Sequence, residues 1–295
     1  MKLLGILVLS AWTLAAAQLP DISSIKPDLF VPALAEGHPA AGRRVKQTLP
    51  DRRDTEAYHI LYLPTDWQPG KRYPVLVELA GNGPYRNRFG DISTGHVEGS
   101  KLGYGISAGK GYIWLCVPYL NNAGDRNVTR WWGDPPTYDP EPTIDYCIDT
   151  VAHVAAHYGA DTNRLVLCGF SRGAIACNFI GLHNDRIAGM WRAFVPYSHY
   201  DGVRTGWPYP GKDRASAIRR LRRLAGRPQF ICGEGTNADA TRKYLETTGV
   251  KGEFTIAGTG FRNHNDAWTL RPSPARRQLR DWLGRVLKDQ PATRR

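Results

Sequence analysis

Hydrophobic and polar positions along the chain form two kinds of block, short apolar runs and longer stretches with helical spacing. From residue 43 onward, apolar runs predict strands at 44–49, 56–63, 73–79, 112–118, 164–168, 193–196, 229–232 and 253–257. The first two runs predict an antiparallel pair that precedes the central strands. Because amphipathic stretches separate the later runs, the pattern favours an α/β fold with a mostly parallel, eight-stranded sheet and helices on both faces.

The helical stretches are recognised by apolar residues three and four positions apart. This spacing is clearest after Pro142 and in the closing segment that contains Leu279, Trp282 and Leu283. Shorter helices are expected at 174–182, 216–224 and 240–247. Each predicted helix can therefore cover one face of the sheet with its apolar side.

The two ends of the chain differ in composition from its centre. Residues 1–17 contain one lysine, an apolar run and three closing alanines, which predicts a secretory signal peptide and a secreted or periplasmic protein. The apolar run is shorter than the roughly 20 residues that a spanning helix needs, so no stable membrane insertion is expected. An irregular segment at 18–42 and a single domain at 43–290 are expected to follow.

The chain is basic, with a formal net charge of +12. Arginine clusters at 219–223 and 276–277 fall in predicted helices and are interpreted as solvated faces. No nucleic-acid-binding module is recognisable, so nucleic acid is not an expected partner. The five cysteines are odd in number and lack C-x-x-C spacing, which favours buried thiols and excludes a cysteine metal site, while one oxidised pair stays open.

A G-x-S-x-G motif lies between a predicted strand and a predicted helix. It reads Gly169, Phe170, Ser171, Arg172, Gly173. In such a strand–turn–helix context the serine occupies a strained turn that exposes its hydroxyl, and the flanking glycines leave room for the turn. Ser171 is therefore the candidate nucleophile.

A neutral serine hydroxyl needs a base within hydrogen-bond reach, and histidine suits this task because its pKa lies near neutral pH. His264 lies in a polar loop between the last predicted strand and the last helix. A loop there can reach the carboxyl edge of a parallel sheet, where ligands bind in open α/β folds. We expect His264 to be the base, with His199 as the one rival or a residue that lines the pocket.

The acid that orients the base is expected between the serine and the histidine, at a strand end. The segment 233–239 follows the strand at 229–232 and contains Glu234 and Asp239. Asp239 is the first choice for the acid, with Glu234 and Asp201 as alternatives. The competing interpretation of Asp239 is helix capping, and that of Glu234 and Asp201 is a solvated loop carboxylate.

Negative charge that develops on a substrate oxygen needs preorganised NH donors. The backbone NH of Arg172, directly after Ser171, is one expected donor. The loop at 80–83, which reads Ala-Gly-Asn-Gly, is the expected source of the second, at Asn82. A plain turn is the alternative interpretation of this loop.

The chain resembles the α/β-hydrolase superfamily across nearly all of its length after residue 17. The resemblance rests on the order of the candidate site residues along the chain: the loop at 80–83, then Ser171, a carboxylate and His264. Within this superfamily, the Gly-Phe-Ser-Arg-Gly elbow and His264 before Asp266 and Trp268 resemble secreted bacterial polyhydroxybutyrate depolymerases and feruloyl or acetyl xylan esterases. The resemblance implies ester hydrolysis through an acyl-enzyme, with neither a metal nor an organic cofactor, on a small-molecule or polymeric ester.

Two other classes of function stay open. One is a serine peptidase of the same fold, and the other is a non-catalytic protein that binds carbohydrate or ester ligands. Aromatic loops at 127–139 and 197–210 contain Trp131, Trp207 and Tyr209. Such loops suit a lid or a stacking platform for sugar or phenolic rings, although ordinary packing accounts for them equally.

Overall fold

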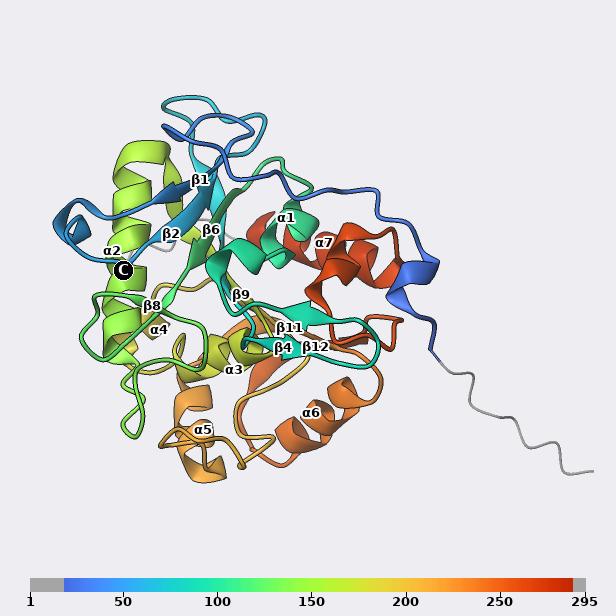
Figure 1. Ribbon diagram of the computed structural model, residues 1–295. Coiled ribbons are helices and arrows are strands. Elements are labelled where there is room, and N and C mark those ends of the chain that lie inside the picture. The colour runs from blue at the N-terminus through green and yellow to red at the C-terminus, as the bar shows by residue number, and fades with distance from the viewer. Residues whose placement is uncertain (1–18, 289–295) are drawn as a thin grey trace, which may run out of the picture.

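An eight-stranded sheet forms the centre of the protein (Figure 1). The computed structural model describes residues 19–288, so the predicted signal peptide at 1–17 lies outside the described part. Across the sheet the strands follow the order β1 (Arg44–Gln47), β2 (His59–Tyr62), β6 (Ile113–Val117), β3 (Tyr73–Leu79), β9 (Ala160–Phe170), β10 (Ala193–Tyr197), β11 (Gly226–Gly233) and β12 (Gly252–Gly258).

Strand directions agree with the sequence pattern. β2 runs antiparallel to both of its neighbours, β1 and β6, and every other neighbouring pair in the sheet is parallel. Successive side chains of a strand point to opposite faces. In β3, Val75 and Val77 therefore join one apolar cluster while Leu76 joins the other. The predicted mostly parallel, eight-stranded sheet is confirmed.

Helices cover both faces of this sheet (Figure 1). The apolar cluster on one face includes side chains of α2 (Glu141–Tyr158), α3 (Arg172–Phe179), α4 (Asp185–Ala188), α5 (Arg214–Arg222) and α6 (Asn237–Glu246), and the cluster on the other face includes those of α1 (Leu102–Ser107) and α7 (Pro274–Lys288). No helix between residues 19 and 288 is both long enough and apolar enough to cross a bilayer.

The start of α1 is held by a buried acid from the middle of the sheet. Both oxygens of the Glu78 carboxylate, on β3, accept hydrogen bonds from the backbone NH groups of Lys101, Leu102 and Gly103 at 2.8–3.1 Å. The indole NH of Trp114 donates to Glu78 as well, at 2.8 Å. Glu78 thus supplies the cap that Lys101 at the N-cap position does not, since the first NH groups of a helix need acceptors from outside the helix.

Two small hairpins lie beyond the carboxyl edge of the sheet. One pairs β4 (Tyr85–Arg86) with β5 (Ile92–Ser93), and the other pairs β7 (Tyr119–Leu120) with β8 (Asn127–Val128). Short 3-10 turns, at η1 (Ile22–Ser24), η2 (Pro50–Arg52), η3 (Val97–Gly99) and η4 (Asp266–Leu270), complete the described elements. These insertions shape the space above the strand ends.

The N-terminal segment is held to the rest of the protein by several hydrogen bonds. The buried Ile22 donates its NH to Asn263 Oδ1 at 2.7 Å. Asp28 accepts two hydrogen bonds from the buried Arg276 of α7. Residues 19–42 therefore bind the part of the chain that follows β12, and not only the surface of the sheet.

The arginine clusters correct one expectation and the cysteines confirm another. Arg220 and Arg276 are buried in ion pairs with Asp201 and Asp28, so these two are not part of a solvated face. Each of these two arginines can be buried with its charge because a carboxylate lies against its guanidinium.

All five cysteines are free and buried, and burial raises the pKa of these thiols. No disulfide links them.

Candidate active site

Ser171 stands on a sharp turn between β9 and α3. Its backbone has φ 56° and ψ −111°, a conformation that side-chain-bearing residues rarely adopt, and its NH donates to Tyr197 O at 3.0 Å. A Cβ added at Gly169 would lie 2.3 Å from the backbone of Gly173, and one added at Gly173 would lie 1.9 Å from Leu79 O. Only glycine fits at both positions, so the strained turn predicted from the motif is confirmed.

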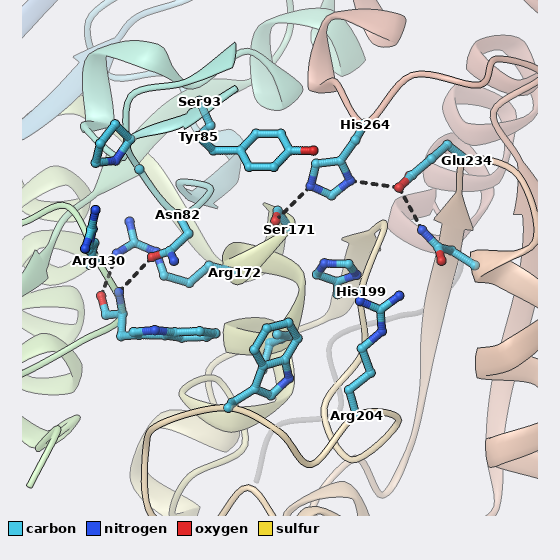
Figure 2. A pocket seen from close by; sticks show the side chains of 16 residues that line it. Asn82, Tyr85, Ser93, Arg130, Ser171, Arg172, His199, Arg204, Glu234 and His264 are labelled. Atoms are coloured by element: carbon cyan, nitrogen blue, oxygen red, sulfur yellow. Dashed lines mark hydrogen bonds and ion pairs between the residues drawn. The ribbon is translucent and has the colours of Figure 1, made fainter. Parts of the chain in front are cut away.

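The Ser171 hydroxyl faces a histidine that a carboxylate orients (Figure 2). Ser171 Oγ lies 3.0 Å from His264 Nε2, and His264 Nδ1 lies 2.7 Å from Glu234 Oε1. With the carboxylate as acceptor, Nδ1 carries the proton and Nε2 is free to accept the serine proton. The geometry therefore allows Ser171 to lose its proton to His264 when it attacks an electrophile.

Further donors hold the Glu234 carboxylate in place. Its Oε1 atom also accepts from Ser198 Oγ at 3.0 Å and from Asn237 Nδ2 at 2.7 Å. Ser198 Oγ lies 2.8 Å from His264 Nδ1, so the hydroxyl bridges base and acid. Burial raises the pKa of Glu234, but hydrogen bonding to His264 and Ser198 and the charge of His264 outweigh it, so the pKa lies below its ordinary value. Glu234 is thus ionised at neutral pH.

Two backbone NH groups beside Ser171 are open to a ligand. Arg172 and Asn82 line the same cavity as Ser171. Among the described residues, neither backbone NH donates to an acceptor of the protein. The Asn82 side chain is directed toward Trp131, because its Oδ1 accepts a hydrogen bond from the backbone NH of Trp131 at 2.9 Å. Unpaired NH groups at such a position can donate hydrogen bonds to a ligand oxygen on which negative charge develops.

The Arg172 side chain fastens the loops around these NH groups. Its guanidinium is buried and donates to Trp131 O at 2.6 Å, Gly81 O at 2.8 Å and Gly95 O at 3.2 Å. It lies over the Tyr119 ring, 3.8 Å from the ring centroid. Burial lowers the pKa of Arg172 to about 10, so the side chain remains charged at neutral pH. One guanidinium thereby ties three separate loops to the start of α3.

A cavity of about 550 Å³ opens over Ser171. Its wall combines the segments that follow β3, β8, β9, β10, β11 and β12 with the hairpin of β4 and β5. Figure 2 labels Arg130 and Arg204 among the side chains around it, and Trp131 and Trp207 line it as well. The residues that line the cavity are Asn82, Gly83, Pro84, Tyr85, Ser93, Arg130, Trp131, Ser171, Arg172, Ile175, His199, Arg204, Trp207, Glu234, Asn237 and His264.

Solved structures with this architecture include hydrolases of several kinds. An S-formylglutathione hydrolase from Agrobacterium tumefaciens matches with a TM-score of 0.59 and 14% identity, over 85% of this chain and 98% of that chain. The α/β-hydrolase fold is the fold of this protein. No protein-family model matches the sequence, and no curated protein matches it.

Two peptidases share the α/β-hydrolase fold with this chain over a smaller part of their length. The isopeptidase AtxE2 matches with a TM-score of 0.53 and 18% identity, over 85% of this chain. An acylaminoacyl peptidase from Pyrococcus horikoshii matches with a TM-score of 0.53 and 16% identity, over 82% of this chain. The chain spans only 41% and 42% of these two proteins. At such identities the likeness concerns the fold.

Within the α/β-hydrolase fold, the carboxylate beside the histidine is Glu234 and not the first-choice Asp239. Glu234 directly follows β11 and lies against His264, whereas Asp239 is exposed in the first turn of α6. A carboxylate there interacts favourably with the helix N-terminus. Asp201 is buried in an ion pair with Arg220, at 2.8 Å, while the hydrogen bond to His264 Nδ1 comes from Glu234. The first choice for the acid is therefore corrected.

Other residues of the site gave no signal in the sequence. Asp91 is buried, and its Oδ2 accepts the backbone NH of His264 at 3.0 Å while its Oδ1 accepts from Asn263 and Asn265. Ser198, whose φ is 88°, could not be identified from the sequence either. An isolated serine or aspartate in a loop has no diagnostic spacing. The rival base His199 lines the cavity with its ring centroid 5.3 Å from that of His264, and Ser171 Oγ is in hydrogen-bond contact with His264. Burial, with the charges of His264 and Arg204, lowers the pKa of His199 to about 4.

Proposed function

We propose that the protein is a serine hydrolase that cleaves carboxylic esters through an acyl-enzyme. The observation that carries this proposal is the hydrogen-bonded chain from Ser171 Oγ through His264 to Glu234, placed on a strained turn at the floor of an open cavity. Nucleophile, base and acid in hydrogen-bond contact are the arrangement that acyl transfer requires.

In the first half of the proposed reaction, Ser171 Oγ attacks the carbonyl carbon of the ester. His264 Nε2 takes the hydroxyl proton, and Glu234 stabilises the imidazolium that results. The NH groups of Arg172 and Asn82 bind the oxyanion, each contributing about 3 kcal/mol to transition-state stabilisation. The bond from the carbonyl carbon to the alcohol oxygen then breaks, and His264 returns the proton to the departing alkoxide.

In the second half, water replaces the alcohol. His264 Nε2 takes one proton of the water, whose oxygen attacks the carbonyl carbon of the acyl-enzyme. When the bond between the acyl carbon and Ser171 Oγ breaks, the proton passes from His264 to Ser171. The products are one carboxylic acid and one alcohol, and the protein returns to its starting state.

The sequence resemblance supplies the candidate substrates for this chemistry. We propose short-chain esters, acetylated xylan, feruloyl esters and hydroxybutyrate oligomers as the set to assay. The composition of residues 1–17 supports a secreted or periplasmic location for the reaction.

Labelling by a fluorophosphonate tests the nucleophile directly. The reagent should form one adduct, on Ser171, and Ser171→Ala should abolish both the adduct and ester hydrolysis. Ser24→Ala, at an exposed position outside the cavity, is the matched control and should be labelled like the parent protein. Equal labelling of Ser171→Ala, measured by intact-protein mass spectrometry, contradicts the proposal.

A comparison of leaving groups separates an esterase from a peptidase of the same fold. We expect faster release of 4-nitrophenol from 4-nitrophenyl acetate than of 4-nitroaniline from amino-acid nitroanilides, by a ratio beyond that of the uncatalysed reactions. A nitroanilide with the higher kcat/KM would replace the esterase assignment with a peptidase. Binding of acetylated xylan without turnover of any ester would favour a non-catalytic protein.

A further inference from the structure

The cavity contains two arginines without ionic partners. Arg130 follows β8 and Arg204 follows β10, and both side chains are exposed at the cavity. Neither forms a hydrogen bond or an ion pair with any residue between 19 and 288. Arg220 and Arg276, in contrast, are buried against carboxylates. The protein thus pairs arginines where they support the fold and leaves these two open toward the cavity.

The two guanidinium groups flank the reacting serine. Figure 2 shows Arg130 on the side of Asn82 and Arg204 on the side of His199, with Ser171 between them. A substrate bound over Ser171 therefore meets a cation on either side.

Among residues 19–288, the cavity wall contains no carboxylate that is free to pair with these cations. Glu234 is the one acidic residue among the described residues of the wall, and its charge faces His264 Nδ1. Arg172 adds a further positive charge, although its guanidinium is buried against carbonyl oxygens. The balance of charge in the cavity is positive, and an anionic group that enters it encounters no carboxylate directed at it.

An aromatic platform lies next to the arginines. Trp131 and Trp207 both line the cavity, and their ring centroids are 5.1 Å apart. Trp131 has φ 49°, and its backbone is held on both sides, the NH by Asn82 and the carbonyl by Arg172. Residues in strained backbone conformations cluster at functional sites, and these contacts fix the position of Trp131 in the cavity wall. Its ring offers a flat surface against which a substrate ring can stack.

We propose that the ester accepted by this site carries a carboxylate on a ring, with Trp131 and Trp207 contacting the ring and Arg130 or Arg204 binding the carboxylate. The proposal rests on the proposed esterase function and names its substrate class. Guanidinium suits this task because its planar NH groups match the two oxygens of a carboxylate. Acidic sugars and aromatic acids in ester linkage both have this chemistry.

Two matched pairs of esters test the preference and tell the two sides of the ester apart. Phenyl acetate and 3-acetoxybenzoate differ by a carboxylate on the alcohol side. The 4-nitrophenyl ester of benzoic acid and the mono-4-nitrophenyl ester of terephthalic acid differ by a carboxylate on the acyl side. We expect kcat/KM to be at least about fivefold higher for the charged member of one pair, the size of a partly exposed ionic contact of about 1 kcal/mol.

The arginine variants assign the preference. Arg204→Gln or Arg130→Gln should remove the preference, by lowering kcat/KM for the charged ester more than for the neutral one. Arg242→Gln, exposed on α6 away from the cavity, is the matched control and should leave both values unchanged. Raising NaCl from about 0.05 M to about 0.5 M should reduce the preference, because salt screens exposed charges.

Two results would overturn the proposal. One is equal kcat/KM within both pairs, and the other is a preference that survives in the double variant Arg130→Gln with Arg204→Gln. Either result leaves the esterase assignment intact as long as Ser171→Ala still abolishes hydrolysis of phenyl acetate. If Ser171→Ala hydrolyses phenyl acetate as fast as the parent protein does, the proposed function itself fails.

Discussion

At the scale of single residues, the site depends on one carboxylate oxygen. Glu234 Oε1 accepts hydrogen bonds from His264, Ser198 and Asn237. The oxygen that orients the imidazole is therefore itself fixed in position. A group that accepts three hydrogen bonds in a buried setting has little freedom to rotate. The tautomer of His264 therefore depends on the charge of Glu234.

Replacing that carboxylate by an amide should leave the shape of the site and change its chemistry. In Glu234→Gln an uncharged amide, which can present either its oxygen or its NH2 group, replaces a group that only accepts, so the proton is no longer held on Nδ1 and the charge that stabilises the imidazolium is lost. We expect kcat to fall by about a hundredfold to ten thousandfold, as in other hydrolases that lose the charge of this group. Asp239→Asn, five residues away and exposed, should stay within a factor of two in the same assay.

The choice between Glu234 and Asp239 shows which part of the site could not be predicted from the sequence. Ser171 and His264 were placed by a motif and by a loop after the last strand, and the structure brings them together. The acid depends on the residue at which β11 stops and α6 begins. β11 ends at Gly233, one residue beyond the predicted end, so Glu234 stands at the strand end while Asp239 enters the helix. Such a boundary lies within the error of any pattern of apolar residues.

At the scale of elements, the hairpin of β4 and β5 positions the loop that contains His264. Asp91, between its two strands, accepts hydrogen bonds from the backbone NH of His264 and from the amide groups of Asn87, Asn263 and Asn265. All of these groups are donors. A carboxylate can accept from all of them, whereas an amide would direct its NH2 group at one or more of them. The hairpin and the loop therefore form one unit.

Asp91→Asn should loosen that unit. Its NH2 group would face donors, and an unsatisfied buried donor costs about 1–3 kcal/mol of folding free energy. Because the His264 loop shifts, we expect kcat to fall by about tenfold or more, the scale of losses that follow from misplaced reacting groups. KM should change little. Asp281→Asn, exposed on α7, is the control, and an unchanged kcat in Asp91→Asn would contradict the positioning role.

Long elements were predictable from the sequence and these small ones were not. β3 coincides with the predicted run at 73–79 because its side chains alternate between two buried faces over seven residues. The strands of the two hairpins contain two residues each, too few for any period to show. The hairpin of β4 and β5 contributes Tyr85 and Ser93 to the cavity wall. The sequence therefore indicated the floor of the cavity and its aromatic loops at 127–139 and 197–210, but not this hairpin.

At the scale of the whole molecule, the fold encloses a histidine in neutral form. His59 on β2 is 1% exposed, and its Nδ1 lies 3.0 Å from Tyr146 Oη of α2. Burial, with a smaller contribution from His153, lowers the pKa of His59 to about 3. The ordinary value for histidine is about 6.5. Below that pH the unfolded chain binds a proton at His59 that the folded chain does not bind.

The folded state should therefore lose stability as the pH falls from 6.5 toward 3. Between pH 7 and pH 4.5, the linkage at His59 amounts to about 2.5 kcal/mol of unfolding free energy. In urea titrations, the parent protein should lose about that much more stability over this interval than His59→Phe does. His38→Gln, at an exposed position, should lose as much as the parent. Parallel pH profiles for the parent and His59→Phe would show that His59 titrates normally in the folded protein.

The five buried thiols have a practical consequence for studying the cavity in motion. A thiol reacts with maleimides and methanethiosulfonates as its anion, and burial both shields these sulfurs and suppresses their ionisation. A cysteine placed at the exposed Ile92 of the hairpin is thus open to spin or fluorophore labels while the native sulfurs remain unlabelled. The native chain already serves as the background for spectroscopy that asks whether the hairpin moves when an ester is added.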